Sequence, residues 1–174
     1  QVDFFPEVEP LIFGGGTRVM SLRDGLNKMS KSDISDYSRI NVMDSKDLIV
    51  NKIKKAKTDS SVIMGQEVLD ESGKLSKEII NQRPEACNLL QIYSAISEAS
   101  ITETLKNFEG KEFRVLKEVL AEILIQKIFP IGHEVRKMLN EENYLTRVLE
   151  EGAQKAKEQA EENLKEIKNI IGFI

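Results

Sequence analysis

Apolar residues recur every three or four positions through most of the second half of the chain, which is the period of an amphipathic helix. The clearest stripe consists of Leu145, Leu149, Ala153, Ala156, Ala160, Leu164, Ile167 and Ile171. Its repeated alanines favour the close approach of a neighbouring helix. Glutamate and lysine fill the rest of this surface, so the pattern predicts one long packing helix at the end of the chain.

The same period predicts three more helices between residues 84 and 129. Pro84 suits the first turn of a helix, and its apolar residues are Leu89, Leu90, Ile92, Tyr93 and Ile96. Residues 100–103, Ser-Ile-Thr-Glu, are typical of the capped start of a short helix. A third helix is predicted over Lys111–Phe129, and Pro130 is expected to stop or kink it.

The first part of the chain has no helical period. Pro6 and Pro10 push the residues before them towards extended geometry, so the first ten residues are expected to form a strap. The three glycines at 14–16 predict a flexible break. Residues 17–22 are short and largely apolar and end in a turn at 23–25, which predicts a buried strand of a parallel sheet. Ligands of α/β folds bind at the carboxyl ends of such strands.

A helix is predicted from Asp44 or Ser45 to Lys57, after a mixed connector. One side of it carries Leu48, Ile49, Ile53 and Ala56. Most of the other side is basic, and the lysines are Lys46, Lys52, Lys54, Lys55 and Lys57. These lysines can contact RNA phosphates in a salt-sensitive way, or they can form an ordinary solvated face. The pattern favours neither interpretation.

Composition narrows the class of protein. The chain has 174 residues, of which 40% are hydrophobic and 31% charged, as in soluble globular proteins. Its net charge of −4 argues against a generally basic nucleic-acid-binding surface, so any RNA contact must be a local patch. A single cysteine excludes an intrachain disulfide and a cysteine-cluster metal site, and fits the cytoplasm. No apolar run is long enough to cross a membrane. Because the first residue is Gln1, we expect a fragment of a longer protein.

The strongest chemical signal is the stretch Lys28-Met29-Ser30-Lys31-Ser32. It follows the predicted strand end and a turn at Asp24-Gly25. Two lysines three residues apart, with serines between them, make a compact cationic loop. Such a loop can bind a polyphosphate, because ammonium groups and hydroxyls bond the oxygens as charge builds on a leaving pyrophosphate.

This stretch resembles, letter for letter, the Lys-Met-Ser-Lys-Ser signature of class I aminoacyl-tRNA synthetases. The lead-in Arg18-Val19-Met20-Ser21-Leu22 narrows the resemblance to tryptophanyl-tRNA synthetases of the bacterial and organellar type. Further matches follow in the same order along the chain, at residues 52–59, 88–93, 108–111, 151–156 and 171–173. The resemblance therefore covers essentially the whole chain. Departures are Cys87 and the lead-in at 14–17, and neither touches the lysine loop.

The resemblance implies a ligase that joins tryptophan to tRNA(Trp) in two steps, through tryptophanyl-adenylate, with ATP and Mg²⁺ as the co-substrate. Lys28 and Lys31 would act on the pyrophosphate as catalytic residues, with Ser30 and Ser32 as hydroxyl partners. The backbone of Val19 and the Met29 region would border adenine, which completes the ATP-binding set. No metal site in the protein itself is expected.

The resemblance also implies a fold and partners. We expect a mainly α chain: residues 1–43 are the end of a Rossmann-like α/β catalytic domain with its last strand and lysine loop, and residues 44–174 are a helical domain of the anticodon-binding type. Weak contacts with tRNA are assigned to Lys52, Lys54, Lys55 and Lys57. The whole protein is expected to be a cytoplasmic homodimer without a membrane segment. This piece alone is expected to be inactive, because the catalytic body lies upstream.

Two other functions stay open at this point. One is a non-catalytic helical module that binds tRNA or protein, and the other is the related tyrosyl-tRNA synthetase, which shares the fold and the loop chemistry. His133, in Pro-Ile-Gly-His, superficially resembles a second synthetase signature, but it is expected at the start of a helix and is rejected as catalytic. Cys87 is expected to be a small buried hydrophobic residue.

Overall fold

The computed structural model describes residues 4–11 and 18–173. The chain divides into two compact units, one of residues 12–133 and one of residues 1–11 with 134–174. The predicted glycine break at 14–16 and the first residue of the predicted strand lie outside the described residues. The domain boundary predicted between residues 43 and 44 falls inside the larger unit and stays a prediction.

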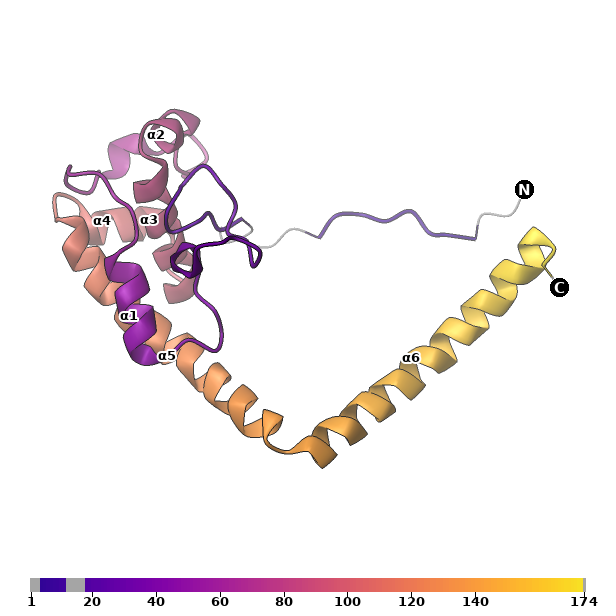
Figure 1. The fold of residues 1–174 in the computed structure, drawn as a ribbon. Helices are drawn as coiled ribbons and strands as arrows, with labels where there is room; N and C mark the ends of the chain where they lie inside the picture. Colours follow the sequence, from indigo (N-terminus) through magenta and orange to yellow (C-terminus); the bar gives the residue numbers. More distant parts are fainter. Residues whose placement is uncertain (1–3, 12–17, 174) are drawn as a thin grey trace. The chain divides into compact units, whose positions relative to one another are not determined.

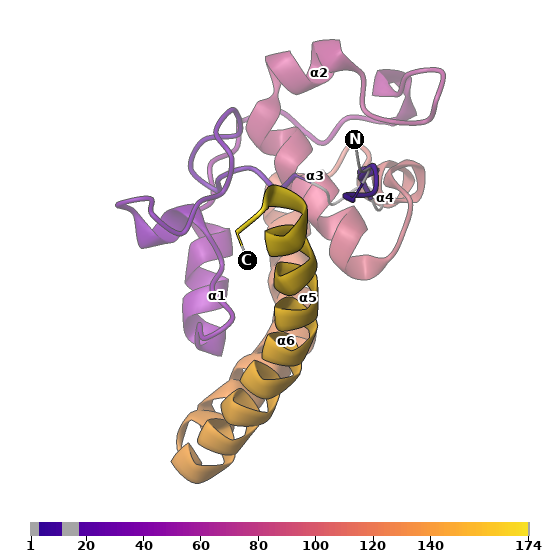
Figure 2. The ribbon, with the colours of Figure 1, turned by 90° about the vertical axis from the view of Figure 1, so that its right-hand side faces the viewer.

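The larger unit is built mainly from helices, which confirms the predicted fold class. They are α1 (Lys46–Lys54), α2 (Lys77–Gln82), α3 (Pro84–Ser97), α4 (Ile101–Phe108) and the greater part of α5 (Phe113–Leu139) (Figure 1). Two single 3-10 turns, η1 (Asp36–Ser38) and η2 (Gln66–Val68), lie in the connecting segments. Helix α3 contacts both α2 and α4 (Figure 2).

One hydrophobic core holds these helices together. Four helices of this unit place leucine, isoleucine or phenylalanine side chains in it: Ile49 and Ile53 from α1, Leu89 and Leu90 from α3, Leu105 and Phe108 from α4, Leu116, Leu120 and Leu124 from α5. Burying one such side chain stabilises the fold by about 1.5–3 kcal/mol. The core therefore accounts for the predicted helices of the larger unit.

Side-chain caps fix where several helices begin. Ser45 Oγ accepts a hydrogen bond from the Leu48 amide at 3.2 Å and starts α1. Ser100 and Glu103 form a reciprocal capping box at the start of α4, which confirms that expectation. Helix α1 ends three residues before the predicted end at Lys57. The Lys57 amide leaves the helical direction and donates to the Leu22 carbonyl at 2.8 Å.

The sequence analysis missed α2, a helix of six residues. Its N-cap is Ser76, whose hydroxyl accepts from the Ile79 amide at 3.3 Å. The segment carried no prediction, because six residues are too few to show a helical period. The serine followed by Ile79 and Ile80 was the available signal.

The helix does not stop at Pro130, so that alternative of the prediction was wrong: α5 continues through Pro130 to Leu139. The other alternative, a kink at Pro130, stays a prediction. His133 accordingly lies inside α5 and does not open a helix. Packing explains the continuation: Gly132 is buried, and a Cβ atom there would collide with the Val42 carbonyl. Tertiary contacts of this kind override the local preference of proline to break a helix.

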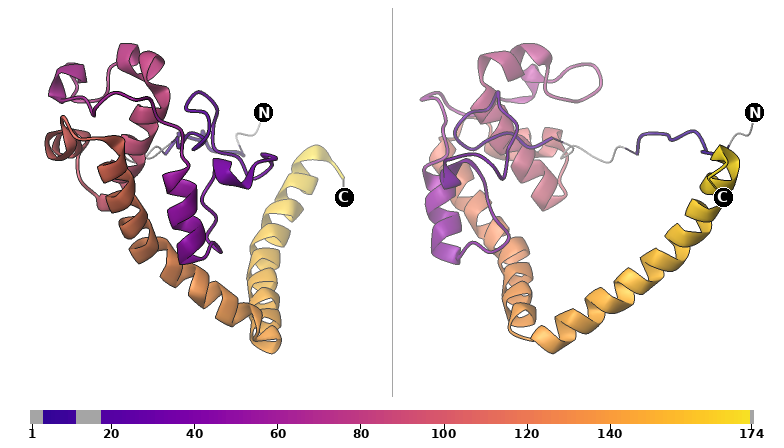
Figure 3. Two further views of the ribbon diagram at one scale, coloured as in Figure 1. Left: turned by 60° about the vertical axis from the view of Figure 1, so that its left-hand side comes forward. Right: turned by 45° about the vertical axis from the view of Figure 1, so that its right-hand side comes forward.

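Helix α6 (Glu142–Ile171) confirms the long C-terminal helix, which Figure 3 shows as one continuous element. It ends at Gly172, whose φ of 74° is the left-handed conformation that glycine adopts easily. None of its residues is buried, and Leu149 and Ile171 are 70% and 61% exposed. The expected close packing against a neighbouring helix is therefore not found among the described residues.

Candidate functional site

The first residues of the lysine loop pair antiparallel with the segment just before it. The loop therefore does not follow a strand of a parallel sheet. The Ser21 amide donates to the Asn27 carbonyl at 2.8 Å, and the Met29 amide donates to the Val19 carbonyl at 3.0 Å. Met20 and Lys28 form one isolated antiparallel β-bridge, and the described residues form no β-strand. The strand predicted over 17–22 was therefore wrong. The run pairs with the loop that follows it, which a single-segment pattern cannot reveal.

A side chain of α3 occupies the position of a strand neighbour beside this turn. Asn88 Oδ1 accepts from the Met20 amide at 3.0 Å, and its Nδ2 donates to the carbonyls of Met20 at 2.9 Å and Ser21 at 3.3 Å. Asn88 is only 2% exposed. One buried amide thus satisfies backbone groups that a sheet would otherwise pair. The segment before the loop is held in extended form without a sheet.

A second set of bonds closes the turn between the paired segments. Asp24 Oδ1 accepts from the Leu26 amide at 3.0 Å and Oδ2 accepts from Asn27 Nδ2 at 2.6 Å. These bonds lower the pKa of Asp24, the backbone bond from Leu26 most of all, so the carboxylate stays ionised near neutral pH. Gly25 is buried against the first turn of α3, where a Cβ atom would collide with the Pro84 backbone. The turn therefore packs closely against the beginning of α3.

The tip of the loop exposes the chemistry that the sequence predicted. Lys28, Ser30, Lys31 and Ser32 are exposed, while Met29 is partly buried against the hydrophobic core. The hydroxyls of Ser30 and Ser32 lie 2.9 Å apart, and the Ser32 amide donates to Ser30 Oγ at 3.3 Å. Met29 anchors the loop, so the two lysines and two serines face solvent on an anchored turn.

The two residues expected to border adenine lie next to each other. Besides their backbone bond, Val19 and Met29 line the same apolar cavity of about 270 Å³. Its other walls come from the core, and they are Leu22, Ile40, Ile53, Ile92, Ala95, Ile96, Leu124 and Ile128. The loop and the apolar cavity are thus adjacent features of one small region.

The four lysines assigned to tRNA contacts do not form one face. Lys52 was misassigned: its side chain is 0% exposed, and its ammonium lies 2.7 Å from the carboxylates of Asp36 and Asp44. A buried, paired ammonium cannot reach a phosphate. The apolar spacing of α1 placed it on the solvent side, because the carboxylates that pair with it leave no mark in a hydrophobic pattern.

The other three of these lysines are exposed, but each has different surroundings. Lys55 lies 4.7 Å from the centre of the Tyr37 ring. Lys57 pairs with Glu85 at 2.6 Å, and the hydrogen bond that its ammonium donates to this carboxylate raises the pKa of Lys57. Lys54 lines a pocket between α1 and α5. Of the three, Lys54 is therefore the one beside a cavity.

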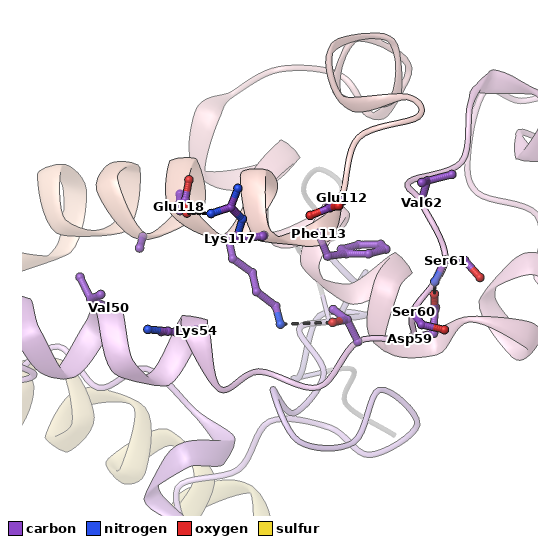
Figure 4. A pocket seen from close by; sticks show the side chains of 13 residues that line it. Val50, Lys54, Asp59, Ser60, Ser61, Val62, Glu112, Phe113, Lys117 and Glu118 are labelled. Atoms are coloured by element: carbon purple, nitrogen blue, oxygen red, sulfur yellow. Dashed lines mark hydrogen bonds and ion pairs between the residues drawn. The ribbon is translucent and has the colours of Figure 1, made fainter.

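This pocket has a volume of about 640 Å³ and lies between α1, the segment 58–62 and the beginning of α5 (Figure 4). Lys54, Arg114 and Lys117 contribute three cations to its walls. Figure 4 shows Lys117 reaching from α5 to the segment after α1, where its ammonium donates to the Ala56 carbonyl at 2.8 Å and to Thr58 Oγ1 at 3.2 Å. Burial lowers the pKa of Lys117. The carboxylates of Asp59, Glu112 and Glu118 also line the pocket, so its three cations are matched by three anions.

Two residues to which the sequence analysis gave no catalytic role, Cys87 and His133, lie among groups that suit a structural role. Cys87 is 1% exposed, and burial raises the pKa of its thiol to about 12, so it stays protonated and unreactive. His133 lies beside the Phe129 ring, with ring centres 6.5 Å apart.

Among the described residues, no three His, Cys, Asp or Glu side chains converge on a possible metal site. None of the described helices combines the length and apolarity needed to cross a membrane.

Three positions with polar contacts near the loop or the pocket were missed from the sequence: Asn88, Lys117 and Arg39, whose guanidinium donates to the carbonyls of Asp33 and Ser35. Asn88 was quoted only as part of a matching motif. Its signal was a polar residue on the apolar side of a predicted helix, where a buried amide must have partners. For Arg39 and Lys117 no local pattern separates a buried or bridging cation from a solvated one.

Comparison with known proteins gives a consistent result. The family described as tRNA synthetases class I (W and Y) matches residues 1–129. A tryptophan–tRNA ligase of Rhizobium meliloti is 42% identical over 171 residues, covering 98% of this chain and 46% of the relative. One from Rickettsia conorii is 47% identical, covering 97% of this chain and 47% of the relative. The chain thus spans about half the length of the curated relatives it matches.

Solved structures show a similar fold. A tryptophanyl-tRNA synthetase from Mycoplasma pneumoniae superimposes with a TM-score of 0.68 at 24% sequence identity. The match covers 91% of this chain and 46% of that one. At this identity the similarity concerns the fold alone.

Proposed function

Since the chain belongs to the class I tRNA synthetases of the tryptophan and tyrosine family, we propose that it is part of a tryptophan–tRNA ligase. The whole protein would activate tryptophan with ATP to tryptophanyl-adenylate and then esterify tRNA(Trp). The observation that carries the proposal is the anchored loop, which exposes Lys28, Lys31 and two serine hydroxyls beside an apolar cavity.

The proposed chemistry is stabilisation of a leaving group. A carboxylate oxygen of tryptophan attacks the α-phosphorus of ATP, and the bond from that phosphorus to the bridging oxygen of the β-phosphate breaks. Negative charge grows on the departing pyrophosphate, and the ammonium groups of Lys28 and Lys31 bind it more tightly as it grows. Ser30 and Ser32, which bond each other here, would turn their hydroxyls to phosphate oxygens. Mg²⁺ enters as part of the MgATP substrate.

Adenine is assigned to the region of Val19 and Met29. Their shared hydrogen bond and the apolar cavity that both line support this assignment, because an adenine ring buries its faces against apolar side chains. The loop tip would then lie on the phosphate side of the nucleotide. Binding of ATP would select a closed position of the loop.

Contacts with tRNA are assigned to the lysine and arginine side chains of the pocket between α1 and α5. Lys54 keeps its assignment and is joined by Arg114, which is exposed, and by Lys117. Lys55 and Lys57 keep weaker assignments because Tyr37 and Glu85 already contact their ammonium groups. A helical RNA-binding module without catalysis would use this same pocket, so it remains the alternative function.

Tryptophan is preferred to tyrosine as the amino acid because curated relatives of 40–47% identity are tryptophan–tRNA ligases. A cytoplasmic homodimer is proposed for the whole protein on the same family relation. The chain of 174 residues by itself is proposed to be inactive, since it spans about half of these relatives.

The test is amino-acid-dependent ATP–pyrophosphate exchange by the full-length protein that contains this chain. Exchange with tryptophan and at least about a hundredfold less with tyrosine is expected, because a site built to bury one side chain discriminates strongly against another. Exchange with tyrosine instead would favour the tyrosyl enzyme. Binding of tRNA without exchange would favour the non-catalytic module. Exchange by the isolated 174-residue chain would contradict its proposed inactivity.

A further inference from the structure

A buried ionic cluster lies behind the lysine loop and has no part in the function proposed so far. At its centre is the ammonium of Lys52 on α1, with 0% of its side chain exposed. Carboxylate oxygens of Asp36 and Asp44 both lie 2.7 Å from this nitrogen. Asp44 is buried at 5% exposure, whereas 48% of the Asp36 side chain is exposed. The cluster therefore runs from the interior to the surface.

Asp36 carries the cluster into the segment that follows the lysine loop. It lies in η1, four residues after Ser32. Its Oδ1 lies 3.1 Å from Arg39 Nη2 and accepts from Asn41 Nδ2 at 2.9 Å. The hydrogen bond from Lys52 is the main cause of a lowered pKa at Asp36, so this carboxylate stays ionised. It is thus held from both sides by cations.

Arg39 completes the connection to the loop backbone. Its Nη1 donates to the carbonyls of Asp33 at 3.0 Å and Ser35 at 3.3 Å, and its Nε donates to Asn41 Oδ1 at 3.2 Å. Asp33 is the residue directly after the lysine loop. The rigid fork of a guanidinium fixes several acceptors at once, which an ammonium cannot do. Through Arg39 and Asp36, the end of the loop is fastened to α1.

We propose that Asp36, Arg39 and Lys52 form a clasp that fixes the segment 33–38 and thereby sets where Lys31 and Ser32 stand. The three are positioning residues for the reaction proposed above, and the inference rests on that function. Buried ion pairs contribute little net stability but fix one arrangement against others. The carboxylates of Asp44 and Asp36, which share the buried ammonium of Lys52, suit this role of fixing one arrangement. The second of them, Asp36, is half exposed and belongs to the loop segment.

The decisive variant is Asp36→Asn. It keeps the size of the side chain and the pair of Lys52 with Asp44, but it removes the charge that joins the loop segment to the cluster. Lys52→Met is a poorer test, because it leaves Asp44 buried without its partner and endangers folding. Asp47→Asn is the matched control, since Asp47 is an exposed carboxylate in the first turn of the same helix.

The first measurement is tryptic cleavage after Lys31 in the folded full-length protein, followed by mass spectrometry. Loosening the clasp raises the population of open loop conformations, so Asp36→Asn is expected to be cut about tenfold faster than the wild type. Asp47→Asn is expected to be cut at the wild-type rate. The melting temperature of each variant is also measured. If faster cleavage came from a general loss of stability, the melting temperature would fall along with it.

The second measurement is the kinetics of exchange. Asp36→Asn is expected to lower kcat for ATP–pyrophosphate exchange about tenfold, because the lysines are displaced from the phosphate, while the KM for tryptophan stays unchanged. Arg39→Lys keeps the charge but loses the fork and is expected to give a similar loss. The double variant should lose little more than either single one, as residues of one cluster do.

Unchanged cleavage and unchanged kcat in Asp36→Asn would overturn the proposal. Equal losses in kcat, in affinity for tryptophan and in melting temperature would overturn it too, because they would indicate a purely structural role. If the wild-type protein shows no tryptophan-dependent exchange, the proposed function fails. The cleavage measurement then still decides whether the clasp holds the loop.

Discussion

At the scale of single residues, polar side chains bond the backbone on both sides of the lysine loop. Asn88 joins α3 to the backbone before the loop, and Arg39 joins the backbone after it to α1. The Asn88 bonds join segments far apart in sequence, whereas Arg39 bonds carbonyls four and six residues before it and reaches α1 only through Asp36 and Lys52. Hydrogen bonds of this kind are worth more for the arrangement they select than for their net energy.

Asn88→Ala is expected to lower the free energy of unfolding by about 1–3 kcal/mol, since it leaves the Met20 amide and two carbonyls without their partner in a buried place. Asn88→Asp should be at least as damaging, because it lacks the donor and adds a charge at a site of 2% exposure. Urea unfolding of both variants measures this. Asn51→Ala, on the exposed part of α1, is the control and should change little. A neutral Asn88→Ala would contradict the role assigned to this amide.

A pH dependence is expected at Asp59, whose pKa is lowered mainly by a hydrogen bond from Arg83. Arg83 Nη2 and Nε bond the two oxygens of this carboxylate at 2.7 and 2.9 Å. A lowered folded-state pKa contributes stability above the ordinary value of 3.8, and this contribution is lost as the pH falls through the folded value. The pair is partly exposed, so the contribution is at most about 1 kcal/mol.

Asp59→Asn should therefore be less stable than the wild type near neutral pH, and the difference should shrink as the pH falls below 3.8. Urea midpoints along a pH series give the comparison, with Glu118→Gln as an exposed control. A difference that is independent of pH would mean that the carboxylate contributes through packing and not through its charge.

At the scale of elements, hydrophobic period and caps predicted most of the helices. The period predicted α3, α5 and α6, and caps at Ser45 and Ser100 marked the starts of α1 and α4. What these signals could not give depends on contacts between distant segments. The run after residue 17 looks like a strand, but its partners are the following loop and Asn88. The burial of Lys52 depends on two carboxylates that only the fold brings together.

Helix α5 provides the element-scale test. Gly132→Ala should destabilise the protein by about 1–3 kcal/mol, because the new methyl group collides with the backbone of Val42. Gly152→Ala in α6 is the matched control: no atom lies near the new methyl group, and replacing a helical glycine is expected to add about 0.5–1 kcal/mol of helix stability. Thermal unfolding of the two variants measures both effects. Equal effects of both changes would contradict the packing of Gly132 against residue 42.

At the scale of the whole molecule, the lysine loop was predicted from its five letters and the family relation. The residues that hold its backbone were not predicted. Spacing alone places Lys28 and Lys31 on one loop because they are close in sequence. The pocket between α1 and α5 combines residues more than fifty positions apart, so no local sequence pattern predicts it.

Binding of tRNA tests the pocket. Lys54→Gln should weaken binding of tRNA(Trp) and lower the slope of log affinity against log salt by about 0.7–0.9, the contribution of one phosphate contact. Lys165→Gln, an exposed change on α6 outside the pocket, serves as the control. Filter binding across a salt series with the full-length protein gives the slope. A slope that stays unchanged in Lys54→Gln would remove the pocket from the proposed tRNA surface.

The central claim is that the lysine loop stabilises the departing pyrophosphate, and the most direct measurement is the single-turnover rate of adenylate formation by Lys31→Ala in the full-length protein. The rate is expected to fall about a hundredfold or more, as when one preorganised donor to developing charge is removed, while the dissociation constant of tryptophan stays the same. Equal losses in rate and in tryptophan affinity, or an unchanged rate, would contradict the account.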